Sequence, residues 1–328
     1  MGLIKRTSIV DMSREDWLAE RRKAIGGSDA SAILRLNPYT TPYALWADKT
    51  GRLPDKEDNE AMRQGRDLEQ YVVDRFSEVS GRRCRRVNAI LTNTDYPYSS
   101  ANIDREVVGE SAGLECKTTS VLNLKKFRDG EFPDTYYCQC VHYLAVTQWT
   151  RWYLAVLVLN KGFMVYQLTR AENDEKPDWC ESSVYVSDGE IRALMGAESA
   201  FWTRYVIPDI PPPADGLKPT SETISALYPV GGEKEVISLD CENTFRSYAA
   251  LKQQIAALKV EQERCEQVLK KAMGAHERGE CGKFTVTWKP SERRTFDHKK
   301  FEKENPDMDL SPYYKLSASR RFEVKETA

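Results

Sequence analysis

Two acidic residues and a lysine form the pattern in this chain with the clearest chemical potential. Asp104 is followed, a short distance downstream, by the triplet Glu115-Cys116-Lys117 in an apolar run that predicts a strand. Because side chains alternate between the two faces of a strand, Glu115 and Lys117 project from the same side. Carboxylates are the hard oxygen ligands that Mg²⁺ prefers, and a nearby ammonium can offset charge on a phosphate. The pattern therefore indicates hydrolysis of a phosphodiester bond.

The Glu-x-Lys triplet is weak evidence by itself. The chain also carries Glu323-Val324-Lys325, and Asp-x-Lys triplets begin at Asp174 and Asp297. In a sequence that is 30% charged, such spacings usually lie on solvated surface. The first triplet differs because it has an upstream aspartate, an apolar flank and a downstream helix that carries Gln139.

The elements around these residues alternate between helices and strands. Ser13 and Thr41-Pro42 are typical helix starts, Gly51 and Gly81 are typical helix ends, and Ser28-Asp29 can cap a short helix. Helices are predicted over 30–36, 41–49, 59–80 and 188–206, and two more are predicted to begin near residues 13 and 133. Strands are predicted near 85–92, 99–107, 112–118, 151–159 and 162–169. This order predicts an α/β fold with a central mixed sheet flanked by helices.

Three parts of the chain are expected. Residues 1–207 form the α/β domain, and the prolines that begin at Pro208 predict a stiff, extended linker over 208–238. In the appendage, 239–328, apolar residues recur in steps of three and four as in a coiled coil, and strands are expected near 284–288 and 320–325. The appendage either packs back on the first domain or serves as an arm for self-association or for a partner.

Composition narrows the class of protein. With 328 residues, 41% of them hydrophobic, the chain can bury a full core. No apolar run approaches the roughly 20 residues of a membrane span, and no targeting segment is visible, so a cytosolic protein is expected. The net charge of −2 argues against a protein that coats nucleic acid. Basic clusters at 21–23, 82–86 and 125–128 are either solvated faces or phosphate contacts.

The eight cysteines include no Cys-x-x-Cys pair. Zinc sites favour such close pairs, so reduced and mostly buried thiols are expected. An iron–sulfur cluster built from scattered cysteines is the alternative.

Several motifs together resemble those of a known family. They are Trp17-x-x-x-Arg21 with Ile25-Gly26-Gly27-Ser28-Asp29-Ala30; Asn37-Pro38-Tyr39 with Leu45-Trp46 and Lys49-Thr50-Gly51; Gly65-x-x-x-Glu69; and Asp104 with Glu115-Cys116-Lys117 and Tyr136-x-x-Gln139. Their order and spacing over 13–169 are similar to those of the YqaJ-type viral recombinases, relatives of the lambda exonuclease in the PD-(D/E)xK nuclease superfamily. The resemblance implies a restriction-endonuclease-like core and an Mg²⁺-dependent 5′→3′ double-strand DNA exonuclease of phage-type recombination, with Mn²⁺ as a substitute ion.

The same resemblance implies the ligands of the metal. Asp104 and Glu115, with the backbone carbonyl of Cys116, match the ligand positions. Glu69 matches a carboxylate on a helix that reaches the metal either directly or through a water molecule. A solvated position on the helix face is the alternative for Glu69. The departures from the family pattern are Gln70, where a Pro is common, and Arg105, where a Gly is common.

Further roles follow from the resemblance. Lys117 matches the catalytic lysine, and Gln139 matches the residue beside the nucleophilic water, with bonding to the backbone as its alternative. Arg21 and Ser28 match positions that hold a terminal 5′-phosphate, which suits an Arg fork and a helix N-terminus. Whether Arg21 or Arg22 faces the site stays open.

The resemblance also implies partners and leaves alternatives for the function. The implied partners are double-strand DNA ends, further copies of the chain in a trimeric ring, and a single-strand annealing protein. The resemblance also implies a phage or prophage protein in the cytoplasm of a bacterial host, without a membrane partner. The alternatives are a phage-type DNA endonuclease of the same superfamily and an inactive module that binds DNA ends.

Overall fold

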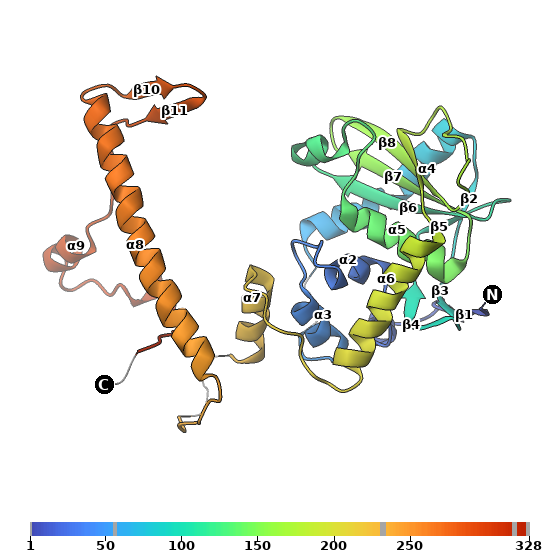
Figure 1. Cartoon of the computed structure of the whole chain (residues 1–328), viewed down its shortest axis with the longest axis horizontal. Coiled ribbons are helices and arrows are strands. Elements are labelled where there is room, and N and C mark those ends of the chain that lie inside the picture. The colour runs from blue at the N-terminus through green and yellow to red at the C-terminus, as the bar shows by residue number, and fades with distance from the viewer. Residues whose placement is uncertain (1, 55–57, 230–233, 317–319, 326–328) are drawn as a thin grey trace. The chain divides into compact units, whose positions relative to one another are not determined.

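The protein divides into two compact units, Met1–Tyr228 and Pro229–Ala328, which we describe separately. The structure is a computed structural model that describes residues 2–54, 58–229, 234–316 and 320–325 (Figure 1). The boundary between the units falls inside the segment 208–238 that was expected to be a linker.

The first unit is built on a six-stranded mixed sheet. Its strands are β2 (Cys84–Arg86), β5 (Arg105–Val107), β6 (Ala112–Thr119), β7 (Arg151–Val158), β8 (Gly162–Thr169) and β9 (Ser182–Tyr185), in that spatial order. The pairs β6–β7 and β8–β9 are parallel and the others are antiparallel. A second, three-stranded sheet has the order β1 (Ile4–Ser8), β3 (Ala89–Asn93) and β4 (Tyr96–Ala101).

Helices cover both faces of the large sheet (Figure 1). On one face, α4 (Glu60–Ser80) packs Val72, Val73 and Phe76 against the sheet. On the other face, α5 (Asp134–Thr147) is buried against the sheet, and α6 (Asp188–Phe201) packs on α5 and continues as a short π-helical turn, η2 (Trp202–Val206). The α/β class with a central mixed sheet flanked by helices is confirmed.

Three N-terminal helices, α1 (Arg14–Arg22), α2 (Gly27–Ile33) and α3 (Pro42–Lys49), pack beside this core. The starts of α1 and α3 are confirmed, because the Ser13 and Thr41 side chains accept backbone N–H groups there. The start of α2 differs from the prediction. Gly26 is its N-cap, and the Asp29 carboxylate accepts the Gly26 N–H at 2.9 Å. Capping therefore does not use the Ser28 hydroxyl.

The strand predicted over 99–107 is in fact two strands in different sheets. The chain leaves the small sheet after Ala101, at the end of β4, and joins the large sheet at Arg105, where β5 begins. The strand predicted over 85–92 breaks in the same way into β2 and β3. Both halves of each run are β-prone, so alternation alone does not reveal the crossover. The break has a consequence for the site, because Asp104 lies in it.

The extended-linker prediction is wrong for residues 218–227, which form helix α7 (Lys218–Leu227). The Thr220 hydroxyl lies 2.8 Å from the Thr41 hydroxyl at the start of α3, and both residues are buried. Pro219 stands in the first helical turn, where a residue without an N–H and with a fixed φ is well tolerated. This proline therefore begins a helix instead of extending the chain.

The second unit contains a long helix, α8 (Glu242–Met273), a hairpin of β10 (Arg278–Cys281) and β11 (Phe284–Thr287), and a short helix, α9 (His298–Glu304). Two 3-10 turns complete the chain, η1 (Val121–Phe127) in the first unit and η3 (Ser311–Tyr313) in the second. The strand predicted over 320–325 is wrong, since these residues carry no regular structure. Among the described residues, no helix has the length and apolar character needed to cross a membrane.

Candidate active site

Strand β6 presents Glu115 and Lys117 on the face that α5 covers. Leu114 and Cys116 alternate to the opposite face and pack in the cluster that α4 covers. Lys117 Nζ donates to Glu115 Oε1 at 2.6 Å, and Glu115 is only 3% exposed. Burial opposes the charge on Lys117, but Glu115 and Asp104 outweigh burial and raise its pKa. Lys117 is therefore an ammonium over the whole physiological range.

Asp104 joins this pair through the register of the sheet. Arg105 lies opposite Leu114 in the antiparallel pair β5–β6, so Asp104, one residue earlier, lies beside Glu115. Asp104 Oδ2 accepts the backbone N–H of Cys116 at 2.8 Å. Burial and the negative charge of Glu115 raise the pKa of Asp104 well above its usual value. Two carboxylates thus crowd one buried position, at a cost in free energy.

The carboxylate pair fits a hard divalent cation. Glu115 Oε2 is buried, and it has no hydrogen-bond partner among the described residues. A cation between the two carboxylates would coordinate this oxygen and offset their repulsion. Burial raises the pKa of the Cys116 thiol well above its usual value, so its sulfur is a poor ligand and its backbone carbonyl is the suitable one.

Glu69, on α4, lies at the edge of the cluster and is turned toward Arg105. The buried Arg105 guanidinium donates to the Glu69 carboxylate, to Gln70 Oε1 at 3.2 Å and to the Asp104 carbonyl oxygen at 2.7 Å. The two departures from the family pattern, Gln70 and Arg105, thus bond to each other. No three His, Cys, Asp or Glu side chains of the described residues are grouped closely enough to hold a metal ion. A water-mediated role fits the position of Glu69 better than direct ligation.

Gln139 connects α5 to the β6 pair. Its Oε1 accepts from Lys117 Nζ at 2.9 Å, and its Nε2 donates to Glu115 Oε1 at 2.6 Å and to the Tyr143 hydroxyl at 2.9 Å. Gln139 is 7% exposed, and these bonds go to side chains rather than to the backbone. Its amide therefore fixes the lysine and the carboxylate in one orientation.

A buried network holds α5 in place behind this cluster. One ring nitrogen of His142 lies 2.8 Å from Glu198 Oε1 on α6, and the other lies 2.8 Å from the Ser100 carbonyl oxygen on β4. Ser99 donates to Glu198 Oε2 at 2.6 Å. Burial opposes the charge on His142, but Glu198 outweighs it and raises the pKa of the imidazole. Sequence reasoning missed this network because its members are far apart in the chain.

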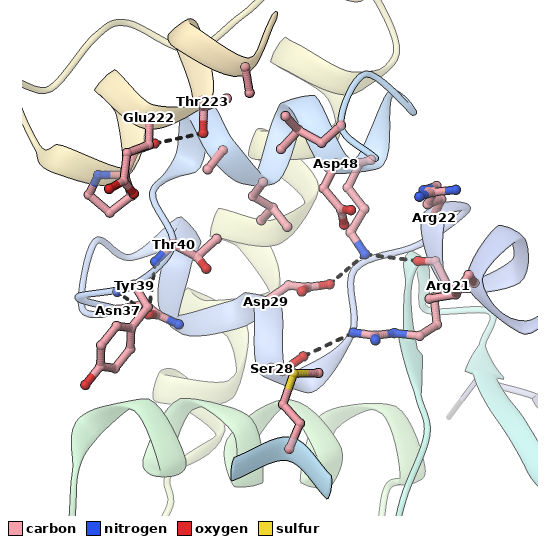
Figure 2. A pocket seen from close by; sticks show the side chains of 18 of the residues that line it. Arg21, Arg22, Ser28, Asp29, Asn37, Tyr39, Thr40, Asp48, Glu222 and Thr223 are labelled. Carbon is pink, nitrogen blue, oxygen red and sulfur yellow. Dashed lines mark hydrogen bonds and ion pairs between the residues drawn. The ribbon is translucent and has the colours of Figure 1, made fainter. Parts of the chain in front are cut away.

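A second site lies in a pocket of about 700 Å³ that α1, α2, α3 and α7 line (Figure 2). Arg21 Nη2 donates to Ser28 Oγ at 3.4 Å, and the guanidinium lies 5.0 Å from the centre of the Trp17 ring. Beside them, Lys49 Nζ contacts Asp29 Oδ2 at 2.6 Å and donates to the Arg21 carbonyl oxygen at 3.0 Å. Because Lys49 neutralises Asp29, the Arg21 charge stays available to an anion.

Arg21 rather than Arg22 contacts Ser28, although Arg22 lines the same pocket. Residues of α7 also line it, and Figure 2 shows two of them, Glu222 and Thr223, across the pocket from Arg21. The sequence offered no sign of this contribution, because α7 fell in the predicted linker.

A smaller pocket of about 180 Å³ extends from the large pocket toward α5. It shares Arg21 and Ser28 with the large pocket and reaches Tyr143, whose hydroxyl accepts from Gln139. Gly27 allows this approach, since a Cβ there would lie 2.7 Å from the Tyr143 ring. The structure thus brings Asp104, Glu115, Lys117 and Gln139 into one cluster, with Glu69 at its edge and with Arg21 and Ser28 in an adjoining pocket.

Comparison with known proteins identifies the family. The model of the YqaJ-like viral recombinase domain matches residues 16–150. The uncharacterized protein YqaJ of Bacillus subtilis (strain 168) is 37% identical over 323 residues, which cover 97% of this chain and 96% of that protein. Among solved structures, an alkaline exonuclease from Laribacter hongkongensis is similar (16% identity, 58% of this chain and 91% of that chain, TM-score 0.44), as is a phage-related exonuclease from Haemophilus somnus 129PT (9%, 56% and 93%, TM-score 0.38). Because the Bacillus relative matches over almost its whole length, the chain belongs to the family of YqaJ-like viral recombinases.

Proposed function

We propose that this protein is an Mg²⁺-dependent exonuclease that hydrolyses double-strand DNA from its 5′ ends in phage-type recombination. The observation that carries the proposal is the short link between two sites: Tyr143, which lines a pocket with Arg21 and Ser28, accepts a hydrogen bond from Gln139 of the cluster. A buried carboxylate pair with a lysine lies next to a pocket in which Arg21 and Ser28 face each other. Membership in a viral recombinase family supports the biological setting.

Each group of the cluster has a distinct task in this proposal. Asp104, Glu115 and the Cys116 carbonyl would hold Mg²⁺, or Mn²⁺ in its place, and the ion would polarise the phosphate and make its bound water more acidic. The Lys117 ammonium offsets the charge that grows on the phosphate during attack. Gln139 bonds to both this ammonium and the Glu115 carboxylate and keeps the two groups in one orientation.

The adjoining pocket favours an exonuclease over an endonuclease. A terminal phosphate carries nearly two negative charges and offers three oxygens, whereas an internal diester carries one charge. A guanidinium beside a hydroxyl binds the terminal phosphate more strongly than the diester, because hydrogen bonds between charged groups are stronger than those between neutral groups. Holding the 5′-phosphate in the pocket would place a nearby diester bond at the carboxylate cluster.

Digestion of linear and covalently closed circular duplex DNA tests the reaction class. We expect Mg²⁺-dependent loss of the linear DNA and no cleavage of the circle. Cleavage of the circle would establish the endonuclease alternative, and intact DNA of both forms, despite binding to the linear ends, would establish an inactive end-binding module. The last alternative is weakened because Asp104, Glu115 and Lys117 are all present.

Arg21→Ala should remove the preference for phosphorylated ends. In the wild type, duplex with 5′-phosphates should be degraded faster than duplex with 5′-hydroxyl groups, and in the variant the two rates should be equal. Initial rates on the two substrates measure this. Arg22→Ala is the matched control and should keep the preference. Equal rates in the wild type, or a preference that survives Arg21→Ala, would contradict the assignment of Arg21.

Gly27→Ala should disturb both sites, whereas Gly26→Ala should have a much smaller effect. A Cβ at Gly27 would lie 2.7 Å from the Tyr143 ring and 3.1 Å from Gln139 Cγ, but at Gly26 it would meet only Asp29, at 3.5 Å. Overpacking of this kind costs about 1–3 kcal/mol. Thermal unfolding and single-turnover cleavage of both variants measure the effect. Similar behaviour of the two variants would show that the approach of α2 to α5 is not tight.

Assembly and location belong to the same proposal. Three copies would form a ring around the duplex, so that the enzyme stays on DNA by topology, and its single-strand product would pass to an annealing protein. Both steps would take place in the cytoplasm of a bacterial host. These points rest on the family resemblance and on the modest net charge of −2, which suits a ring better than a tight grip.

A further inference from the structure

Helix α8 carries an uninterrupted heptad seam. The steps between its members are alternately three and four residues: Tyr248, Leu251, Ile255, Leu258, Gln262, Cys265, Leu269 and Ala272. A strict repeat of this kind aligns one stripe along the helix and is typical of a coiled coil. The seam extends over roughly 36 Å at the rise of an α-helix.

The seam faces solvent within its own unit. Of the 32 residues of α8, all of which the structure describes, only Met273 is buried. Leu258 is 68% exposed, and Leu251, Ile255 and Leu269 are each at least half exposed. Tyr248, at one end, contacts the Phe322 ring at 6.2 Å between centroids. A mostly apolar stripe of this length is costly in water, so a partner helix is expected to cover it.

We propose that this stripe binds the same stripe of a second copy of the chain, with the two helices antiparallel. In the register that uses the whole seam, Tyr248 faces Ala272 of the second copy, and Leu251 faces Leu269. Ile255 then faces Cys265, and Leu258 faces Gln262, whose length is similar, so that no layer holds two aromatic or two small side chains. In a parallel pair each residue faces itself, so the Tyr248 layer is crowded and the Ala272 layer is underfilled.

The charges beside the seam favour the same orientation. Lys252 and Lys259 flank its first half, and Glu261 and Glu266 flank its second half. In the antiparallel pair, Lys252 lies beside Glu266 of the second copy, and this contact occurs twice. Lys259 and Glu261 each meet their own counterpart once, at the two-fold axis, so these two contacts join like charges and oppose the two attractive ones. A parallel pair instead places Glu261 beside Glu266 twice and forms no opposite-charge contact at these positions.

This self-complementarity identifies the partner as a second copy rather than an unrelated helix. The seam is symmetric about a point near Val260, so that reversing the helix places Tyr248 opposite Ala272, Ile255 opposite Cys265, and Lys252 beside Glu266. A different partner would carry the complementary residues on its own sequence, and α8 would need no such symmetry. Flanking charges of this kind decide partner and orientation in coiled coils.

Leu258→Asp in the full chain tests the pairing. A charge in the seam should separate the paired copies and lower the mass in solution. Val260→Asp is the matched control, since Val260 lies two residues away on the outer face and is 72% exposed. Light scattering measures the mass, and circular dichroism checks that both variants keep their helix. Equal masses for Leu258→Asp, Val260→Asp and the wild type would overturn the proposal.

Ile255→Cys tests the orientation. In the antiparallel register, Ile255 faces Cys265 of the second copy, so this variant should form a covalent dimer with a short thiol-to-thiol cross-linker. This link should be absent from Ile255→Cys combined with Cys265→Ser, and the wild type should form no dimer through Cys265. A parallel pair predicts the opposite, because Cys265 would face itself and the wild type would already cross-link. Cross-linking of the wild type through Cys265 would therefore overturn the antiparallel arrangement.

Discussion

Glu115→Gln should abolish DNA hydrolysis and leave the protein folded. The substitution removes one of the two crowded carboxylates but keeps the shape of the side chain, and its oxygen can still accept from Lys117. In chelator, the variant should be at least as stable as the wild type, because Asp104 no longer faces a second negative charge. Added Mg²⁺ should raise the unfolding temperature of the wild type and not that of the variant. Binding at a hundred times Kd contributes about 2.7 kcal/mol.

Glu106→Gln is the matched control for this result. Glu106 lies on the neighbouring strand β5 and also has a buried oxygen without a hydrogen-bond partner among the described residues. Its carboxylate pairs with Arg85 at 2.8 Å and with Arg6 at 3.9 Å instead of facing Asp104. This control should keep both hydrolysis and the stabilisation by Mg²⁺. Hydrolysis by Glu115→Gln at the wild-type rate would remove Glu115 from the metal site.

Lys117→Ala should lower the rate of cleavage by about 10³-fold, as expected for loss of a group that stabilises charge in the transition state. Affinity for DNA should change little, because the ammonium acts most strongly on a phosphate under attack. Lys117→Arg should recover little activity. The planar guanidinium cannot replace a compact ammonium between Glu115 and Gln139.

Single-turnover rates and equilibrium binding, measured on the same labelled duplex, separate the two effects. Lys126→Ala, in the basic cluster of η1, is the control and should weaken binding more than it slows chemistry. If rate and affinity fell in parallel for Lys117→Ala, this lysine would be a binding residue.

The local signals in the sequence explain which parts of the fold could be predicted. Ser13 and Thr41 begin helices and Gly81 ends one, each through contacts within a few residues, so these positions follow from the local sequence. The crossover at Asp104 does not, because both of its sides favour strands and only the packing of two sheets separates them. Helix α7 was missed for a related reason. Pro219 and the prolines that precede the helix resemble a linker until the contact of Thr220 with α3 is known.

The candidate site shows the same division. Alternation on a strand was sufficient to put Glu115 and Lys117 on one face, and the structure agrees. The tie between Arg105 and Glu69 and the approach of Gly27 to Tyr143 depend on elements that are far apart in sequence. Sequence reasoning noted Arg105 as a departure but could not show that it holds the helix carboxylate.

One measurement tests the central claim most directly. A linear duplex with a 5′-phosphate at one end only, labelled separately on each strand, is incubated with the full chain in Mg²⁺. We predict stepwise loss of the 5′-phosphorylated strand from its 5′ end, with the complementary strand intact. Internal cuts, degradation from 3′ ends, or equal attack at both ends would contradict the coupling of the Arg21–Ser28 pocket to the carboxylate cluster.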